Sequence, residues 1–388
     1  MSGFVSETPP PKLRLGMVGG GQGAFIGAVH RMASRLDDQF ELVAGALSST
    51  PDKALASGQQ LGLQPDRIYS SFDDMARKES EREDGIEVVS IVTPNHMHFQ
   101  AAETFLNRRI SVICDKPMTN TLSEAQRLHD IAERSGAAFI LTHNYSGYPM
   151  VRQAREMVAN GDIGQVRVVQ AEYIQGWLSE RLEESGAKQA EWRTDPTRAG
   201  AGGSIGDIGT HAYHLAGFIS GLETETLAAD LSTFVPGRKL DDNAHIMLRY
   251  SSGAKGMIWT SQIAVGKENA LKVRIFGELG SLEWEQENPN YLYYTPKGEA
   301  TRILTRGGPN SSDAATRITR IPAGHPEGYL EGFATIYSEA AAIVRARQKG
   351  QAVDSQVQAP TTDDGIAGVK FIEACVRSSQ QNSSWVRL

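Results

Sequence analysis

From Leu13 to about Asn144, short apolar runs alternate with stretches in which apolar residues recur at helical spacing. The apolar runs end in glycine, proline or polar residues, as buried strands of a parallel sheet do. Between them, Val29, Met32, Ala33 and Leu36 fall on one side of a predicted helix. We count six strand-like runs within about 130 residues, which predicts a doubly wound parallel sheet with helices on both faces.

Beyond Asn144 the pattern changes to strict alternation of apolar and polar residues, which predicts half-buried strands. Such strands are expected within 165–177, 243–252, 254–264 and 270–278, with a hairpin over 280–296. Two helices, over 328–348 and 363–379, end the chain. We therefore predict an α/β fold in two parts: an N-terminal Rossmann domain with a doubly wound parallel sheet, and a C-terminal α+β domain with a large, mostly antiparallel open sheet.

The predicted boundaries are a flexible tail over 1–12, a Rossmann domain over 13–142 and a substrate-binding and oligomerisation domain over 143–388. A chain of 388 residues favours two domains over one. The net charge of −7, without a dense basic block, argues against nucleic acid as a partner.

The chain has no secretory leader pattern and no apolar stretch of membrane-spanning length, so we expect no membrane association. The two cysteines, Cys114 and Cys375, form no scaffold pattern, which favours a reducing, cytoplasmic location.

A glycine-rich turn follows the first predicted strand. Gly19, Gly21 and Ala24 match G-x-G-x-x-G/A, in which glycine lets the backbone approach a pyrophosphate and the next helix offers free N–H groups. A glycine turn alone also fits a tight strand-to-helix connection, but its place after the first strand favours dinucleotide binding. Residues 24–30 lengthen the loop before the helical spacing begins, so we expect an enlarged phosphate loop.

The end of the second predicted strand holds Ser48 and Ser49, where NAD-binding proteins usually carry an acid for the ribose. No acid repels a 2′-phosphate and no arginine attracts one, although Lys53 is a weak phosphate candidate. We therefore expect NAD or NADP, with NAD slightly favoured.

Two further polar segments follow predicted strands, where ligands bind in such sheets. They are Thr93-Pro94-Asn95-His96-Met97-His98 and Cys114-Asp115-Lys116-Pro117. A lysine at a strand's carboxyl end, fixed by a following proline, favours function over a solvated surface charge.

Asp207 and His211 are four residues apart, so on a helical turn they share a face. Alone, the pair slightly favours a structural role, with Asp207 as an N-terminal helix residue and His211 as a partly buried core histidine. The pairs His96/His98 and His211/His214 lack further ligands at metal-binding spacing, so no metal site is predicted.

Together, these motifs and the segment Trp192-Arg193-Thr194-Asp195-Pro196 resemble the Gfo/Idh/MocA family over nearly the whole chain. The resemblance implies a nicotinamide-dependent oxidoreductase with a Rossmann domain and an open sheet that forms a homodimer or homotetramer. It assigns the family lysine to Lys116, with Asp115 in place of the usual glutamate, and the D-x-x-x-H pair to Asp207 and His211.

The resemblance implies that hydride moves between nicotinamide and a carbohydrate or cyclitol carbon, with Lys116, Asp207 and His211 as catalytic residues. His211 would be the base, Lys116 would stabilise the oxygen, and Asp207 would orient the substrate or His211. Substrate contacts are expected from Tyr145, Gln175, Trp177 and His325. The expected cofactor-binding residues are Gly19, Gly21, Gln22, Ala24, Phe25, Ile26, Ser48, Ser49, Lys53, Thr93, Pro94, Asn95, His98, Asp115, Lys116, Pro117, Trp192 and Arg193.

Two alternatives remain open. One is a glycosidase that uses NAD without consuming it, by transient oxidation at C3, elimination, water addition and re-reduction. The other is a non-catalytic NAD(P) sensor on the same fold, which the presence of Lys116, Asp207 and His211 disfavours.

Overall fold

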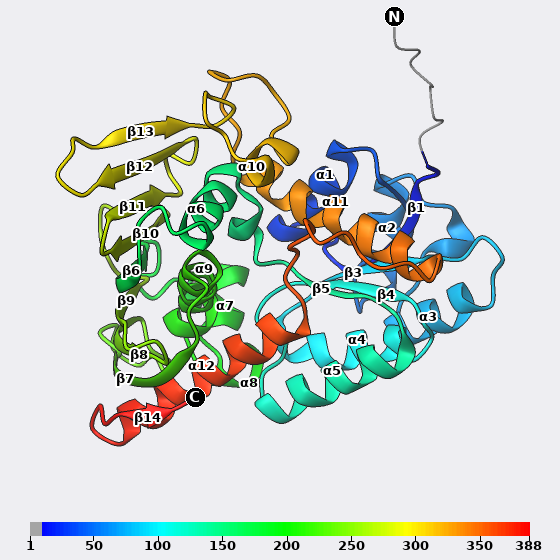
Figure 1. The fold of residues 1–388 in the computed structure, drawn as a ribbon. Coiled ribbons are helices and arrows are strands. Elements are labelled where there is room, and N and C mark those ends of the chain that lie inside the picture. The colour runs from blue at the N-terminus through cyan, green and yellow to red at the C-terminus, as the bar shows by residue number, and fades with distance from the viewer. Residues whose placement is uncertain (1–9) are drawn as a thin grey trace, which may run out of the picture.

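The computed structural model describes residues 10–388, so the predicted N-terminal tail lies mostly outside the described residues. The first part of the chain forms a five-stranded, all-parallel sheet in the order β2-β1-β3-β4-β5 (Figure 1). Its strands are β1 (Leu13–Gly19), β2 (Phe40–Ala46), β3 (Val88–Val92), β4 (Ser111–Cys114) and β5 (Phe139–Leu141). The doubly wound prediction is confirmed, with five strands in place of the six counted. In this strand order the switch point, where ligands bind, lies between β1 and β3.

The helices of this part are α1 (Phe25–Leu36), α2 (Pro51–Gln60), α3 (Phe72–Ser80), α4 (His98–Leu106) and α5 (Leu122–Ser135). The predicted enlargement of the phosphate loop is wrong, because α1 already begins at Phe25. Gly27 permits this early start: a Cβ there would lie 2.4 Å from the Cα of Gly20, so only glycine lets the helix pack this closely on the loop.

The second part is a nine-stranded sheet in the order β13-β12-β11-β10-β6-β9-β8-β7-β14, antiparallel at every pairing except β6 with β9. The alternating pattern correctly predicted β6 (Val166–Ile174), β8 (Asn243–Tyr250), β9 (Lys255–Ser261), β10 (Ala270–Gly277), β11 (Gly280–Glu285) and β12 (Tyr291–Pro296). It missed β7 (Thr224–Ser232) and the edge strands β13 (Arg302–Thr305) and β14 (Val386–Arg387).

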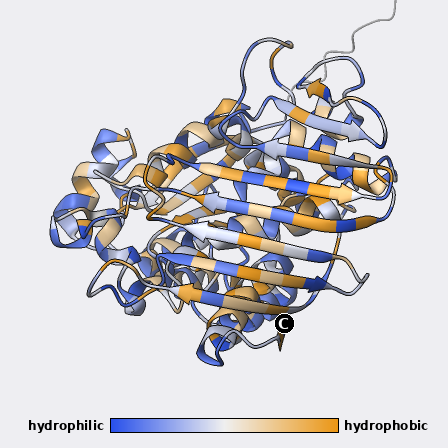
Figure 2. Ribbon diagram, turned by 90° about the vertical axis from the view of Figure 1, so that its left-hand side faces the viewer, coloured by the Kyte–Doolittle hydropathy of each residue, from blue (hydrophilic) through white to orange (hydrophobic). Residues whose placement is uncertain are grey.

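Helices cover one face of this sheet, and the other face is open. Those that pack on its strands are α6 (Pro149–Ala159), α9 (Thr210–Ser220) and α12 (Thr362–Gln380), whereas α7 (Lys188–Arg193), α8 (Pro196–Ala199) and α10 (Asp313–Arg317) contact other helices. Figure 2 shows the open face, where orange and blue residues alternate along the strands. The alternation places Val273 and Ile275 in the core and leaves Lys272 and Arg274 on the open side.

Helix α11 (Tyr329–Gln348) returns to the first part of the chain, where Phe333, Ile336 and Ala340 share a core with Leu15 and Val29. A buried ion pair ties α11 to the second part: Arg152 of α6 lies 2.9 Å from Glu339 of α11, and both side chains are 1% exposed. The end of the chain therefore joins the two sheets.

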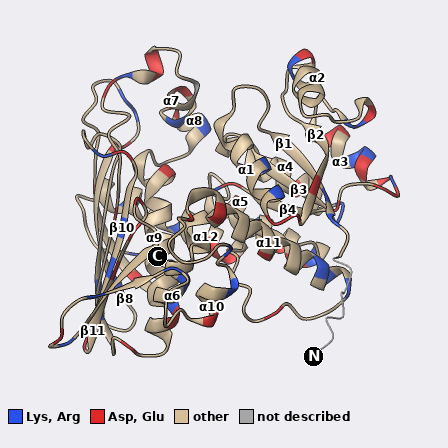
Figure 3. Cartoon of the chain, turned by 90° about the horizontal axis from the view of Figure 1, so that it is seen from above, with Lys and Arg blue, Asp and Glu red and all other residues tan. Residues whose placement is uncertain are grey.

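Basic and acidic residues are interspersed over both parts of the chain (Figure 3). Within residues 10–388, no helix combines the length and the apolar character needed to cross a membrane. Cys114 and Cys375 are both buried free thiols.

Candidate active site

The carboxyl ends of β1 to β4 open onto one cavity of about 1370 Å³ that the second sheet closes on the far side. Single-ligand pockets are usually about 300–1000 Å³, so this cavity has room for a dinucleotide and a second ligand. It brings together nearly all the predicted site residues, from Gly19 in the glycine turn to Trp177 beyond β6. Pro117 and His325 are the predicted residues that do not line it.

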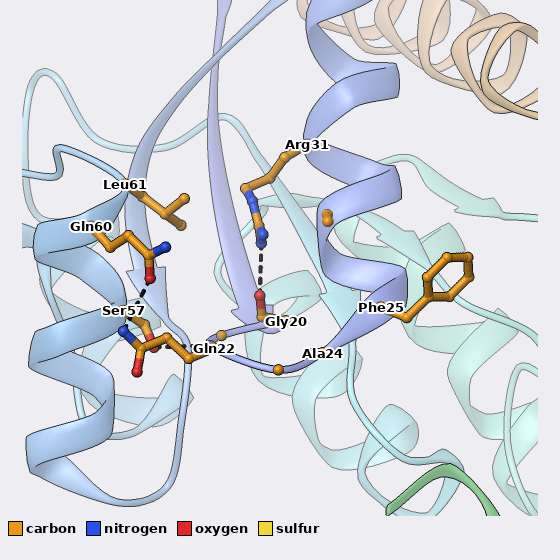
Figure 4. Close-up of a pocket in the computed structure, with 11 residues that line it drawn as sticks. Gly20, Gln22, Ala24, Phe25, Arg31, Ser57, Gln60 and Leu61 are labelled. Atoms are coloured by element: carbon orange, nitrogen blue, oxygen red, sulfur yellow. Dashed lines mark hydrogen bonds between the residues drawn. The ribbon is translucent and has the colours of Figure 1, made fainter.

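Side chains from helices α1 and α2 hold the glycine turn in place (Figure 4). Arg31 donates a hydrogen bond of 2.7 Å to the carbonyl of Gly20, and the Gln22 N–H donates to Ser57 Oγ at 3.1 Å. Gly19, Gly20 and Gly23 adopt positive φ. A Cβ on Gly21 would lie 2.6 Å from the carbonyl oxygen of Leu47, so the turn packs directly on the end of β2.

The start of α1 suits an anion. Its N-cap residue, Ala24, provides no side-chain cap, and the first turn holds no acidic residue. The N–H groups of that turn are therefore left for a ligand, and the positive end of the helix dipole points at the cavity. These features fit the pyrophosphate of a dinucleotide.

The adenosine end of the predicted cofactor path is bordered by Ser48, Ser49 and Lys53, which all line the cavity. Ser48 Oγ accepts the N–H of Thr50 at 3.1 Å, just before α2 begins. Trp192 and Arg193, from α7, also line the cavity. The guanidinium carbon of Arg193 lies 4.3 Å from the ring centroid of Trp192.

His98 and Asn95 hold the cavity's wall together. The two ring nitrogens of His98 lie 2.8 Å from the carbonyl of Pro117 and 2.9 Å from that of Thr93, so His98 links the ends of β3 and β4. Asn95 donates to the carbonyl of Ala199 at 3.0 Å and joins this wall to α8.

Asp207 is the centre of the polar cluster. Its carboxylate accepts hydrogen bonds from Lys116 at 3.0 Å, Arg193 at 3.0 Å and Gln262 at 2.9 Å. Burial by itself would raise the pKa of Asp207, but Arg193 and Lys116 outweigh burial and hold that pKa well below its usual range. Asp207 is therefore an anion whose side-chain hydrogen bonds come from Lys116, Arg193 and Gln262, and none of them comes from His211.

Asp207 lies in a π-helical turn over Ile205–Gly209, directly before α9, and His211 lies in the first turn of α9. His211 lines the cavity, yet its Nδ1 is buried without a hydrogen-bond partner among the described residues. Nε2 is thus the nitrogen accessible from the cavity. Burial and the charge of Lys116 hold the pKa of His211 well below 6.5, so the imidazole is neutral and able to accept a proton.

Asp115 is an anion beside Lys116. Thr142 donates to its Oδ1 at 2.6 Å, and His30 Nε2 lies 3.4 Å from the same oxygen. Burial opposes ionisation, but His30 and Thr142 outweigh it and lower the pKa of Asp115 to about 2.

The second sheet supplies a wall of neutral polar groups. Gln175 and Tyr173 both donate to Asn269 Oδ1 at 2.7 Å, and Trp177 donates to Gln175 at 3.0 Å. The hydroxyls of Tyr145 and Tyr173 are 2.6 Å apart.

Several residues of the site were missed by the sequence-based prediction. Tyr173 occupies an inward position of a predicted strand, and this placement was the only available signal for it. Gln262 and Asn269 lie in the connection between β9 and β10, which carries no motif, and no sequence pattern would have identified them.

The structure does not support His325 as a substrate residue. His325 is exposed in the loop before α11, and its carbonyl accepts a hydrogen bond from Arg306, which also binds Glu327 at 2.9 Å. This pairing holds the loop outside the cavity. Pro117 likewise contributes its carbonyl to His98 and does not line the cavity.

Two family models match this chain: an oxidoreductase family with an NAD-binding Rossmann fold over residues 13–145, and the GFO/IDH/MocA C-terminal domain over residues 151–283. The chain belongs to the Gfo/Idh/MocA family. It is therefore an enzyme of the oxidoreductase class with an NAD-binding Rossmann domain.

Solved members of this family superpose over almost the full length. An oxidoreductase from Sinorhizobium meliloti is 57% identical, with a TM-score of 0.88, over 97% of this chain and 100% of that chain. An inositol dehydrogenase homologue from Azotobacter vinelandii complexed with NAD+ is 35% identical, with a TM-score of 0.94, over 97% of both chains. The same homologue is also known in complex with NADH and myo-inositol. Levoglucosan dehydrogenase of Pseudarthrobacter phenanthrenivorans is 27% identical over 72% of this chain and 75% of its own length.

Proposed function

We propose that this protein oxidises a secondary hydroxyl of a sugar derivative or cyclitol, and reduces the matching ketone, by hydride transfer with NAD or NADP. The observation that carries the proposal is the placement of His211 and the Lys116–Asp207 pair, 3.0 Å apart, in a cavity that runs from the glycine turn to a wall of hydroxyl and amide groups. The names of the relatives agree with this substrate class.

When bound, the nicotinamide dinucleotide supplies the hydride acceptor or donor. The turn at Gly19–Ala24 and the first turn of α1 would hold its pyrophosphate, while Ser48, Ser49 and Lys53 would border the adenosine ribose. NAD is favoured slightly over NADP. Ser48 and Ser49 carry no charge, so Lys53 is the single cation among these three residues that could bind the 2′-phosphate of NADP.

The protein's own residues manage the proton. His211 Nε2 takes the proton of the substrate hydroxyl during oxidation and returns it during reduction. The Lys116 ammonium, anchored by Asp207, donates a hydrogen bond to the same oxygen and stabilises the negative charge that develops on it. Asn269, Gln175, Tyr173 and Tyr145 recognise the remaining hydroxyls with uncharged donors and acceptors.

The test is a kinetic screen of the purified protein with NAD and NADP against sugars, cyclitols and their phosphorylated derivatives, monitored by nicotinamide absorbance. We expect stoichiometric NAD(P)H formation with a neutral polyol. Release of an aglycone without net NADH would point to the redox-neutral glycosidase, and dinucleotide binding without any turnover would point to a sensor; either result would overturn the proposal.

We also propose that the protein forms a homodimer or homotetramer through the open face of its nine-stranded sheet. Large apolar side chains are exposed on this sheet, including Met247 (54%), Met257 (45%) and Ile303 (56%). Apolar side chains gathered on an open sheet favour burial against another surface. Light scattering of Met247→Glu/Met257→Glu should show a smaller species than the wild type, and an unchanged mass would contradict this interface.

A further inference from the structure

Three histidine rings form a contiguous buried cluster that begins at the wall of the cavity. His211 and His214 are three residues apart on α9, and His143 lies between β5 and the turn that holds Tyr145. The His143 ring meets the His211 ring edge to face at a centroid distance of 5.4 Å. It stacks flat on the His214 ring at 4.1 Å. The cluster thus leads from the proposed base away from the cavity, toward the start of α12.

The end of the cluster away from the cavity lies beside a carboxylate. His214 Nε2 lies 3.2 Å from Oδ1 of Asp364, at the start of α12. The other carboxylate oxygen of Asp364 accepts the N–H of Thr361 at 2.8 Å in a capping box, which fixes the carboxylate in place. Burial raises the pKa of Asp364, but the nearby His214 ring outweighs burial and lowers that pKa.

Other charged groups surround the cluster. Lys116 and Asp207 face His211 from the cavity side, and Asp115 adds a more distant negative charge. Arg155 of α6 faces Asp364. On the far side of α12, His129 of α5 lies 2.8 Å from Thr362 and 3.6 Å from Asp363. Burial raises the pKa of Tyr145, whose ring lies 4.9 Å from that of His211, so Tyr145 adds no charge.

We propose that the His214–Asp364 pair tunes the proton affinity of His211: a proton that His214 takes up beside Asp364 disfavours protonation of His211 and so keeps the base ready to accept the substrate proton. The His143 ring lies between the other two rings. Burial, followed by the charges of His214 and His211, holds the pKa of His143 well below 6.5, so His143 stays neutral. The inference rests on the proposed function, because it assumes that His211 is the base.

The sign of the effect follows from electrostatics. A positive charge behind His211 lowers its proton affinity, so removing that charge raises the pKa of His211. Residues three apart on a helix have Cβ atoms about 5–6 Å apart. At such a separation, a single charge shifts the pKa of a neighbouring group that is partly shielded from solvent by about one pH unit.

The test is a nuclear magnetic resonance titration of carbon-13-labelled histidine in the dinucleotide-bound protein, with the His211 signal assigned by its loss in His211→Gln. In His214→Gln we expect the His211 titration to move up by about one pH unit. The acidic limb of the oxidation rate should move with it. His129→Gln, which removes another histidine at the start of α12, is the matched control and should leave the titration in place.

An unmoved His211 titration in folded, dinucleotide-binding His214→Gln would overturn the inference. If His214→Gln does not fold, the smaller uncharged variant His214→Asn gives the same readout. The titration requires no substrate, so a shifted His211 signal in a protein that oxidises no polyol would contradict the proposed function and leave the charge coupling standing.

Discussion

Lys116→Met tests the proposed chemistry most directly, because methionine keeps much of the side-chain volume and removes the charge. Asp207 retains Arg193 at 3.0 Å and Gln262 at 2.9 Å, so the carboxylate stays partnered and the protein should fold. The loss of a donor that stabilises a developing oxyanion lowers kcat by about 10²–10³-fold, equal to about 3–4 kcal/mol. Dinucleotide affinity should change little.

The same variant carries a second signature in its pH profile. Lys116 is a positive charge that lowers the pKa of His211, after burial, which is the larger cause. Removing the charge raises that pKa, so His211 stays protonated to higher pH and the acidic limb of oxidation moves up by about one pH unit.

The assay is steady-state oxidation across a pH series at saturating dinucleotide, with affinity measured separately by fluorescence titration. Lys78→Met is the matched control, because Lys78 is a half-exposed lysine on α3 that pairs with Asp74 at 2.9 Å, away from the cavity. Unchanged kcat, or a loss of kcat that merely follows a loss of dinucleotide affinity, would refute the role of Lys116.

Asp207→Asn should also lower kcat by about 10²-fold, but with the acidic limb moved to lower pH, since Asp207 raises the pKa of His211; a shift in the same direction as Lys116→Met would contradict the assignment. Gly21→Ala places a Cβ 2.6 Å from the Leu47 carbonyl and should weaken dinucleotide binding by about tenfold or more in calorimetry. Gly368→Ala, with open space around its Cβ, should leave binding unchanged. Arg152→Met leaves Glu339 buried with Arg317 as its remaining cation, and should lower the free energy of unfolding by about 3 kcal/mol in urea titration; a loss below about 1 kcal/mol would show that the pair contributes little.

Local patterns predicted much of the fold, because strand and helix periods depend on the side chains of a single segment. The alternation over β8 and β10 and the helical spacing over α1 carry that information directly. The edge strands β13 and β14 were missed because they have four and two residues, too few for a period to show. The prediction that α1 starts late failed because its first residues, Phe25 to Gly27, look like loop until Gly27 is seen packed on Gly20.

Motifs in the sequence pointed to Lys116, Asp207 and His211 but did not predict which partners each side chain binds. The spacing of Asp207 and His211 predicted a shared helical face and left open whether Asp207 orients the substrate or His211. In the folded chain the acid binds Lys116, Arg193 and Gln262, which come from three distant segments, and His211 has no such contact. No periodicity within a segment encodes this choice of partner, since it depends on how the two sheets meet.

The proposed division of roles between Asp207 and His211 has a chemical reason. A carboxylate bonded to His211 would raise its proton affinity, whereas a base for a carbinol proton must stay neutral until the substrate arrives. Because the Asp207 carboxylate binds Lys116 and Arg193, a cation stays near the proposed position of the reacting oxygen. His211 Nε2 still faces the cavity without a partner within residues 10–388. The cation that most affects the pKa of His211 in this arrangement is Lys116, whose counter-ion Asp207 is bonded to that lysine and not to His211. The arrangement requires both sheets to be in place at once.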